Sequence, residues 1–277
     1  MKTVVITGST SGIGKLLVKE FAKLGCRIFA GYRNEAHRAE LESVSLDVIP
    51  FYIDMSKKET VNEATKFILA NLDEFENISA LINAAGAVVA GAMECLSVDK
   101  IREQFEVNTF SHLQLTQGLI SKIQGGKIIN ISSVASFGIF PFIGPYCASK
   151  RSLDILFNSL QLECGADIKV VSVKPGVVKT PLWDKSIENN NEAFSGNEKY
   201  KKEFEFLAKN AKRNNNRGLE AQEVVDLIVK IEKMEKPKAS YTIGLDAKGA
   251  EVLSHLPQGL INFIVKKSLT KRMNKLN

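Results

Sequence analysis

Apolar residues in the first 175 positions gather in short runs, separated by longer stretches in which they recur every three or four residues. The short runs lack polar alternation, which is typical of strands buried on both faces of a parallel sheet. The alternation of the two patterns predicts an α/β fold, a doubly wound parallel sheet with helices on both faces. Strands are predicted at residues 4–6, 27–30, 48–53, 78–82, 126–133 and 168–173, and helices at 15–24, 56–68, 98–123 and from 146 to Gly165.

The second of these helices has a start signal in the sequence. Ser56-Lys57-Lys58-Glu59 has the form of a capping box, in which the serine caps the helix and the glutamate reaches back to it. We therefore expect a helix from Ser56 whose apolar side is made by Val61, Ala64, Phe67 and Ile68.

Beyond the sixth predicted strand the pattern changes. Residues 181–218 are charged and weakly apolar, and we interpret them as an insertion, either disordered or, slightly preferred, a substrate lid. A helix is predicted at 220–234 and a last strand at 241–243. Residues 253–277 place apolar residues before five basic ones and are predicted to form a basic amphipathic tail. This tail can bind an anionic membrane surface, cover the substrate cleft or contact another subunit, and we favour packing over the membrane.

Composition and charge narrow the class of protein. The 37 basic residues exceed the 31 acidic ones but are spread out and not interleaved with aromatic side chains, so no nucleic-acid partner is predicted. Four cysteines and three histidines show no metal-ligand spacing, so no metal is predicted and free thiols in a reducing cytoplasm are expected. The first apolar run is too short for a signal peptide, and no later one reaches the length of a membrane span.

A glycine-rich loop, Thr7-Gly8-Ser9-Thr10-Ser11-Gly12-Ile13-Gly14, joins the first predicted strand to the first helix. Glycines let the backbone turn tightly beside a pyrophosphate, whose charge the N–H groups at the helix start receive. A plain turn is the alternative interpretation. The order of strand, loop and helix favours a dinucleotide site.

The residue after the second predicted strand bears on the choice of cofactor. An acidic residue there accepts a hydrogen bond from the ribose of NAD, whereas an arginine accommodates the extra phosphate of NADP. No aspartate or glutamate occurs between Ile28 and Asn34, and Arg33 lies in this stretch. NADP is therefore favoured and NAD remains possible, since Arg33 can equally be a solvated surface residue.

Two serines and a tyrosine–lysine pair supply candidate catalytic groups. The fifth predicted strand delivers Ser132 and Ser133 to the carboxyl edge of the sheet, where ligands bind in open α/β folds. Tyr146 and Lys150 are four residues apart, which places them on one face of a helix. A nearby cation favours phenolate, so Lys150 is expected to lower the pKa of Tyr146 toward neutrality.

Together these motifs resemble the short-chain dehydrogenase/reductase family, in its shorter single-domain branch, strongly over residues 1–180 and loosely beyond. The resemblance implies one NAD(P)-binding Rossmann domain over residues 1–277 and a catalytic tetrad of Asn108, Ser133, Tyr146 and Lys150. In it, Tyr146 transfers the proton, Ser133 hydrogen-bonds the reacting oxygen, Lys150 holds the nicotinamide ribose, and Asn108 anchors a water. The implied cofactor contacts are Gly8, Ser9, Ser11, Gly12, Ile13, Gly14, Arg33, Asp54, Met55, Asn83, Ala84, Gly86, Tyr146, Lys150, Pro175, Gly176, Val178 and Thr180.

The sequence departs from the family pattern at three positions. Ala84 replaces an asparagine of the Asn-Asn-Ala-Gly motif, Ser111 stands where glycine is frequent, and Ser11 occupies a position that many NADP users fill with a basic residue. The last departure leaves the NADP prediction resting mainly on Arg33.

The leading hypothesis is an NADP(H)-dependent oxidoreductase that interconverts an alcohol and a carbonyl on an apolar, steroid-, retinoid- or lipid-like molecule. The alternatives are a catalytically silent nucleotide-binding regulatory or scaffolding protein and an NAD-dependent dehydrogenase of the same family. By resemblance, the protein is expected to be a homodimer or homotetramer. The apolar substrate is inferred from residues expected to border the cleft, which are Phe137, Ile139, Phe140, Phe142, Ile143, Leu182 and Trp183.

Overall fold

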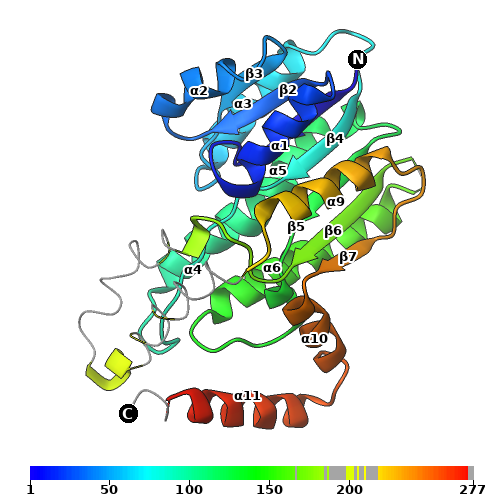
Figure 1. Ribbon diagram of the computed structural model, residues 1–277. Helices are drawn as coiled ribbons and strands as arrows, with labels where there is room; N and C mark the ends of the chain where they lie inside the picture. Colours follow the sequence, from blue (N-terminus) through cyan, green and yellow to red (C-terminus); the bar gives the residue numbers. More distant parts are fainter. Residues whose placement is uncertain are drawn as a thin grey trace.

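Seven parallel strands form one sheet in the order β3-β2-β1-β4-β5-β6-β7 (Figure 1). The structure is a computed structural model, and it describes residues 1–165, 167–183, 186, 198–202, 205, 209 and 218–273. The predicted doubly wound parallel sheet is confirmed. The strands are β1 (Thr3–Ile6), β2 (Arg27–Tyr32), β3 (Val48–Tyr52), β4 (Ile78–Asn83), β5 (Lys127–Ile131), β6 (Lys169–Pro175) and β7 (Ser240–Ile243).

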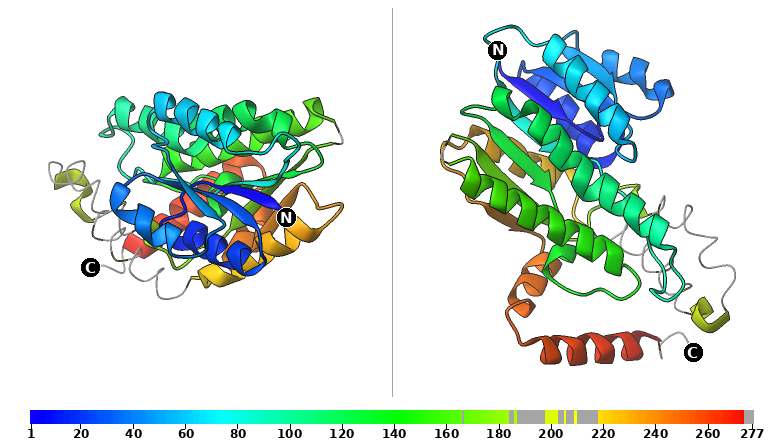
Figure 2. Two further views of the ribbon diagram at one scale, coloured as in Figure 1. Left: turned by 90° about the horizontal axis from the view of Figure 1, so that it is seen from above. Right: turned by 180° about the vertical axis from the view of Figure 1, so that it is seen from behind.

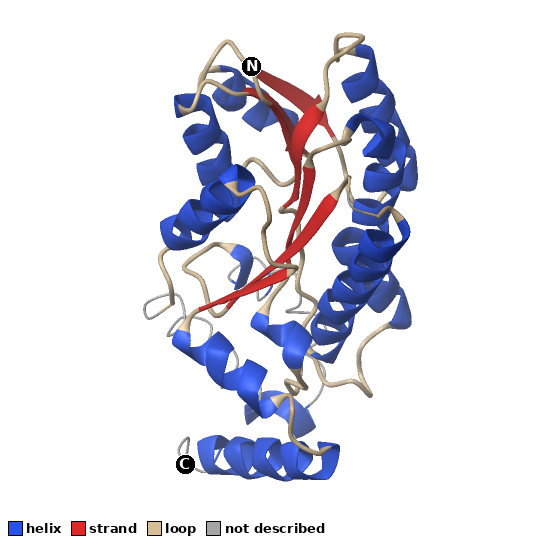
Figure 3. Ribbon diagram, turned by 90° about the vertical axis from the view of Figure 1, so that its right-hand side faces the viewer, coloured by secondary structure: helices blue, strands red, loops and turns tan. Residues whose placement is uncertain are grey.

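Helices cover both faces of the sheet (Figures 2 and 3). One layer contains α1 (Gly12–Lys23), α2 (Arg38–Glu42) and α9 (Ala221–Lys233), and the other contains α3 (Lys58–Ala70), α5 (Ser111–Leu119) and α6 (Gly144–Glu163). In strand β1, Val4 and Ile6 pack into the first layer and Val5 packs into the second, which explains why these three residues are apolar. A strand buried on both faces has no polar side to present.

The strand order reverses beside β1, which pairs with β2 on one side and with β4 on the other. Ile6 is in register with Ala30 and with Ile82. The loops that leave β1, β2 and β4 therefore emerge side by side at the carboxyl edge. In open α/β sheets, the crevice at such a reversal is where ligands bind.

The predicted helix at 98–123 is confirmed as a continuous helical path, but it changes its winding midway. It consists of α4 (Val98–Phe105), the π-helical segment η2 (Glu106–Phe110), α5 and the 3₁₀ turn η3 (Ile120–Lys122). The other short 3₁₀ segments are η1 (Glu35–His37), η4 (Val134–Phe137) and η5 (Glu198–Tyr200). The π-helical segment carries Asn108 to the sheet edge.

The predicted capping box at Ser56 is wrong. Helix α3 begins at Lys58, its N-cap is Lys57, and no side chain caps it. The Ser56 hydroxyl instead donates to Asp54 Oδ1 at 2.8 Å, and the Thr60 hydroxyl donates to the Asp54 carbonyl at 2.8 Å. Asp54 thus organises the turn that the serine was expected to organise. Phe67 was also misplaced, since it is 41% exposed while Val61, Ala64 and Ile68 are buried.

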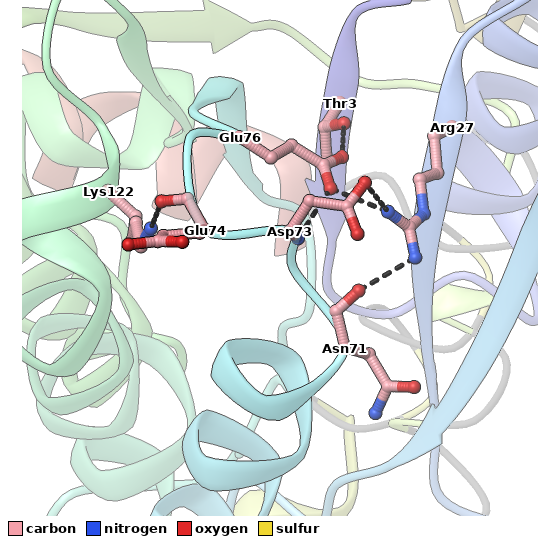
Figure 4. Close-up of polar contacts among 7 residues, drawn as sticks. All are labelled: Thr3, Arg27, Asn71, Asp73, Glu74, Glu76 and Lys122. Carbon is pink, nitrogen blue, oxygen red and sulfur yellow. Dashed lines mark hydrogen bonds and ion pairs between the residues drawn. The ribbon is translucent and has the colours of Figure 1, made fainter.

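A polar cluster fixes the amino edge of the sheet, opposite the ligand crevice (Figure 4). The Glu76 carboxylate, in the loop before β4, pairs with Arg27 Nη1 of β2 at 2.5 Å and accepts from the Thr3 hydroxyl of β1 and from the Asp73 N–H at 3.0 Å. Arg27 also donates to the Asn71 carbonyl at 2.7 Å. Burial alone would raise the pKa of Glu76, but these hydrogen bonds and the Arg27 charge lower it.

The C-terminal helices α10 (Leu245–Leu253) and α11 (Gln258–Met273) lie beyond the carboxyl edge, and α11 stands apart from the sheet (Figures 1 and 2). No residue from 258 to 271 is buried. The predicted amphipathic tail is wrong, because the apolar and basic residues of α11 occupy successive halves of the helix and not opposite faces. Its first half carries Leu260, Ile261, Phe263, Ile264 and Val265, and its second half carries Lys266, Lys267 and Lys271.

Two further observations concern the whole chain. Most of the predicted lid at 181–218 lies outside the described residues. Within the described ranges, no helix combines the length and apolar character needed to cross a membrane.

Candidate active site

The loop between β1 and α1 has the backbone shape of a phosphate cradle. Gly8 has φ +67°, and a Cβ there would lie 2.8 Å from Ala85 Cα. A Cβ on Gly14 would lie 2.2 Å from the Gly8 carbonyl oxygen. No side chain caps α1 at Ser11, and its first turn holds no acidic residue. The N–H groups of Gly12, Ile13 and Gly14 are therefore available to an anion, which fits the pyrophosphate of a dinucleotide.

Some of the predicted cofactor contacts have side chains turned into the protein. Ser9 is fully buried, and its hydroxyl donates to the Ile6 carbonyl at 2.9 Å. Asn83 is fully buried, and its amide donates to Asn130 Oδ1 at 2.7 Å. Met55 is 5% exposed, and its carbonyl accepts from the Ser111 hydroxyl at 2.8 Å. Their hydrogen bonds instead fix the backbone at the carboxyl edge of the sheet.

The replacement at Ala84 leaves the local structure intact. Thr7 Oγ1 accepts from the Ala84 N–H at 3.0 Å and from the Ala85 N–H at 3.1 Å. These bonds join the ends of β1 and β4 through the backbone of Ala84, so they need no particular side chain there.

His112 braces the same segment, which was not foreseen because a histidine in a helix has no distinctive sequence signal. Its ring nitrogens lie 3.1 Å from Asn83 Oδ1 and 3.0 Å from the Ala85 carbonyl, and it is fully buried. Burial and the nearby Lys150 charge lower the pKa of His112 to about 3. The ring is therefore neutral at physiological pH and acts as a hydrogen-bonding strut.

Asn108, Ser133, Tyr146 and Lys150 come from three elements and are all buried. Ser133 is the N-cap of η4, where its Oγ accepts from the Ala135 N–H at 3.1 Å. Tyr146 and Lys150 lie one turn apart on α6. The Ser133 hydroxyl lies near enough to Tyr146 to oppose the rise in its pKa. A Cβ on Gly86 would lie 3.6 Å from both Asn108 Oδ1 and Lys150 Nζ.

The expected lowering of the Tyr146 pKa is wrong. Burial raises the pKa of Tyr146 to about 12, and the nearby Ser133 hydroxyl opposes this rise only in part. Lys150 Nζ donates to the Ile131 carbonyl at 2.9 Å, and burial lowers the pKa of Lys150 to about 8. Lys150 therefore binds the end of β5, and desolvation has the largest effect on the pKa of Tyr146.

Asn108 is held by the backbone of the loop after β4. Its Oδ1 accepts from the Ala87 N–H at 2.8 Å, and its Nδ2 donates to the Ala87 carbonyl at 2.9 Å and to Ser149 Oγ at 3.0 Å. Short π-helical segments frequently occur at functional sites. Here the segment turns Asn108 inward, toward Lys150.

A buried ion pair lies below the tetrad. Lys174 Nζ on β6 is 3.0 Å from Asp154 Oδ2 on α6, and the two side chains are 9% and 2% exposed. Lys174 Nζ also lies 4.5 Å from the centroid of the Phe137 ring, at the end of η4. The pair thus joins β6, α6 and η4.

The predicted cofactor contacts beyond the loop take different positions. Thr180 lies beside the glycine loop, 3.3 Å from where a Cβ on Gly12 would be. Val178 forms a bridge with Leu219. Asp54 is held in its own turn by Ser56. Arg33 follows β2 on the surface, and among the described residues it has no ion pair.

The predicted apolar wall is reproduced in part. Ile143, Leu182 and Trp183 pack with Tyr146, and the rings of Tyr146 and Trp183 are 6.0 Å apart. Ile139 and Phe140 are exposed. Phe142 has φ +69° and packs against Tyr200 with ring centroids 6.2 Å apart.

Comparison with known proteins agrees with this geometry. A family model described as short chain dehydrogenase matches residues 2–191. The chain is 28% identical over 284 residues to the NADPH-dependent 3-dehydrocapnine reductase of Ornithobacterium rhinotracheale, covering 98% of each protein. It is 31% identical over 250 residues to a probable short-chain type dehydrogenase/reductase of Helicobacter pylori, covering 87% of this chain and 88% of that protein.

Solved structures share the fold. A short chain dehydrogenase/reductase from Burkholderia phymatum, in complex with NAD, superimposes with a TM-score of 0.78 at 20% identity, covering 95% of this chain and 94% of that one. The chain therefore belongs to the short-chain dehydrogenase/reductase family and is an NAD(P)-dependent oxidoreductase.

Proposed function

We propose that this enzyme interconverts an alcohol and a carbonyl on an apolar small molecule and uses NADP(H). The observation that carries the proposal is the convergence of Asn108, Ser133, Tyr146 and Lys150 beside a glycine cradle that fits a dinucleotide. When bound, the cofactor supplies or accepts the hydride. The protein residues position the substrate oxygen and move its proton.

Each of the four side chains has a role that follows from its place. The Tyr146 hydroxyl donates a proton to the carbonyl oxygen during reduction and accepts it back during oxidation. Ser133 donates a hydrogen bond to the same oxygen and stabilises its developing charge. Lys150 supplies a buried positive charge beside them. Asn108 binds the backbone of Ala87 and so fixes the loop that Lys150 Nζ faces at Gly86. Trp183 and Leu182 present an apolar wall to the substrate.

The test is Tyr146→Phe, assayed on a panel of apolar ketones and alcohols. Removing the proton donor should lower kcat by roughly 10²–10⁴-fold. Trp183 is the only tryptophan in the sequence and lies against Tyr146, so its fluorescence measures NADPH binding in the same samples. Cofactor affinity should stay close to that of the wild type. Turnover by the variant at the wild-type rate would exclude this role of Tyr146.

The choice of NADP over NAD is argued from Arg33. It follows β2, where the adenosine ribose is expected, and it is exposed with no ion pair among the described residues. The reductase of Ornithobacterium rhinotracheale supports NADP, whereas the Burkholderia phymatum structure contains NAD. Replacing Arg33 with alanine should weaken NADPH binding about tenfold and leave NADH binding unchanged. Tighter binding of NADH than of NADPH by the wild type would contradict the assignment.

We also propose a homo-oligomer in the cytoplasm. Val98, Phe110 and Ile155 are large apolar residues that are about half exposed on α4, η2 and α6, which pack against one another. Exposed large apolar residues mark candidate surfaces for contact with another subunit. The free thiols of Cys26, Cys147 and Cys164 are consistent with a reducing compartment.

A further inference from the structure

The loop after β6 is contacted by a residue from the C-terminal part of the chain. Pro175, Gly176 and Val177 leave the sheet at its carboxyl edge, and the resemblance to the family implies that Pro175 and Gly176 belong to the segment that holds the nicotinamide carboxamide. The Val177 N–H donates to Asp246 Oδ2 at 2.8 Å, and the preceding Gly176 N–H donates to the Ile243 carbonyl at 2.9 Å. Two successive backbone donors of this loop are thus bound by β7 and by the first turn of α10.

A second observation shows how closely Asp246 approaches the loop. A Cβ on Gly176 would lie 2.0 Å from Asp246 Oδ1, and the three nearest atoms are all from the Asp246 carboxylate. Gly176 has no positive φ, so space and not backbone conformation requires glycine here. The carboxylate occupies the volume that any side chain at position 176 would need.

The position of Asp246 is itself well determined. It lies in the first turn of α10, two residues after Gly244, and its neighbour Ala247 is fully buried. Helix α10 packs against η4, which begins next to Ser133. Asp246 is therefore held between the sheet and the catalytic serine loop, more than 60 residues after the segment it binds.

The other side of the same segment is fixed independently. Val177 and Lys179 exchange backbone hydrogen bonds with Leu219, at 2.8 and 2.9 Å. Thr180 then reaches the glycine loop beside Gly12. The segment at 175–180 is thus clamped between Leu219 and Asp246, and only the second clamp depends on a side chain.

We propose that Asp246 is a positioning residue of the cofactor site, which holds Pro175–Val177 in the conformation that binds the nicotinamide end. The proposal rests on the proposed role of this segment in cofactor binding. It makes α10 a functional part of the site, although α10 contributes no group that reacts. The carboxylate acts through the Val177 backbone and through its fit against Gly176.

The experiment uses Asp246→Ala, Asp246→Asn, Gly176→Ala and the double variant Gly176→Ala/Asp246→Ala in the full chain. Loss of a hydrogen bond to a charged group should weaken NADPH binding by roughly five- to tenfold in Asp246→Ala. Asp246→Asn keeps an oxygen acceptor and should stay within about twofold of the wild type. Glu251→Ala removes another carboxylate from α10 and should leave NADPH affinity and unfolding temperature unchanged.

The double variant tests the fit directly. Gly176→Ala forces a methyl group against the carboxylate, and removal of that carboxylate makes room for it. The double variant should therefore bind NADPH more tightly and unfold at a higher temperature than Gly176→Ala alone. The proposal would be overturned if the effects of Gly176→Ala and Asp246→Ala on NADPH affinity and unfolding temperature were additive. Equal losses of NADPH affinity in Asp246→Ala and Asp246→Asn would also overturn it.

The two readouts separate the proposal from the function on which it rests. The unfolding temperatures of the wild type, the two single variants and the double variant are measured without cofactor. They therefore detect the contact between Gly176 and Asp246 even if NADPH does not bind. If the two substitutions had non-additive effects on the unfolding temperature while Asp246→Ala left NADPH affinity unchanged, the positioning role would be overturned. That result would leave the proposed oxidoreductase activity standing. A wild type that binds neither dinucleotide overturns both.

Discussion

The charge on Lys150 depends on a small set of neighbours. Asp154, one turn further along α6, raises the pKa of Lys150, while burial lowers it more strongly, to about 8. Lys174 from β6 pairs with Asp154 and so neutralises part of its charge. His112 from α5 is neutral, and Tyr146 on α6 keeps its proton because its pKa is about 12. The Asp154–Lys174 pair is therefore the main electrostatic control on Lys150.

Two substitutions at this pair should shift the pH profile in opposite directions. Asp154→Asn removes the group that raises the pKa of Lys150, so this pKa falls further and the high-pH loss of kcat/KM moves to lower pH. Lys174→Met leaves Asp154 to act on Lys150 alone, so the same limb moves to higher pH. Both variants break one buried ion pair and should lose about 3–5 kcal/mol of stability. Shifts of the same sign in pH-rate profiles would contradict the electrostatic role.

Among the helices and strands, those whose structure is decided by a single periodic pattern could be predicted from the sequence. The strands that enclose the site have apolar residues on both faces, and the glycine loop has a fixed order, so β1, α1 and the crevice beside them were predictable. The winding of the π-helical segment at Asn108 was not, because it depends on Ala87 and Ser149, which are 21 and 41 residues away. Such contacts leave no local pattern.

The incorrect predictions have the same origin. The motif at Ser56 is compatible with a capping box, but the serine hydroxyl donates its hydrogen bond to Asp54 and does not cap the helix. The pKa of Tyr146 follows from desolvation, which a sequence spacing of four residues does not reveal. Asp246 and His112 act through backbone groups of distant loops. Their roles became apparent only when the fold had brought those loops together.

The polar cluster at the amino edge predicts a pH-dependent contribution to stability (Figure 4). The pKa of Glu76 is lower in the folded state than its usual value of 4.5, so its contribution is present above pH 4.5 and is lost as the pH falls through the folded value. Glu76→Gln should cost about 1–3 kcal/mol in urea unfolding at pH 7, and less at acid pH. Glu74→Gln, in the same loop but exposed, should cost nothing. A pH-independent difference between wild type and Glu76→Gln would exclude this explanation.

At the scale of the whole molecule, the site is assembled from both ends of the chain. The first strand and its glycine loop supply the proposed phosphate cradle, and Asp246 of α10 binds the loop after β6. Between them, α6 carries Tyr146 and Lys150 on its buried face and Ile155 on its outer face, where it is 56% exposed. A contact with a second subunit on that outer face would therefore support the helix that bears the catalytic pair.

This arrangement predicts a link between assembly and activity. Ile155→Arg places a charge on the outer face of α6, where Ile155 is 56% exposed, so it should convert the proposed oligomer to monomers in analytical ultracentrifugation. Val252→Arg, on α10 and 70% exposed, is the matched control and should leave the mass unchanged. Because α6 then loses its external support, kcat should fall in Ile155→Arg even though no catalytic group has changed. A wild type that sediments as a monomer would overturn the proposed oligomer, and an Ile155→Arg variant that keeps the wild-type mass would place the subunit contact elsewhere.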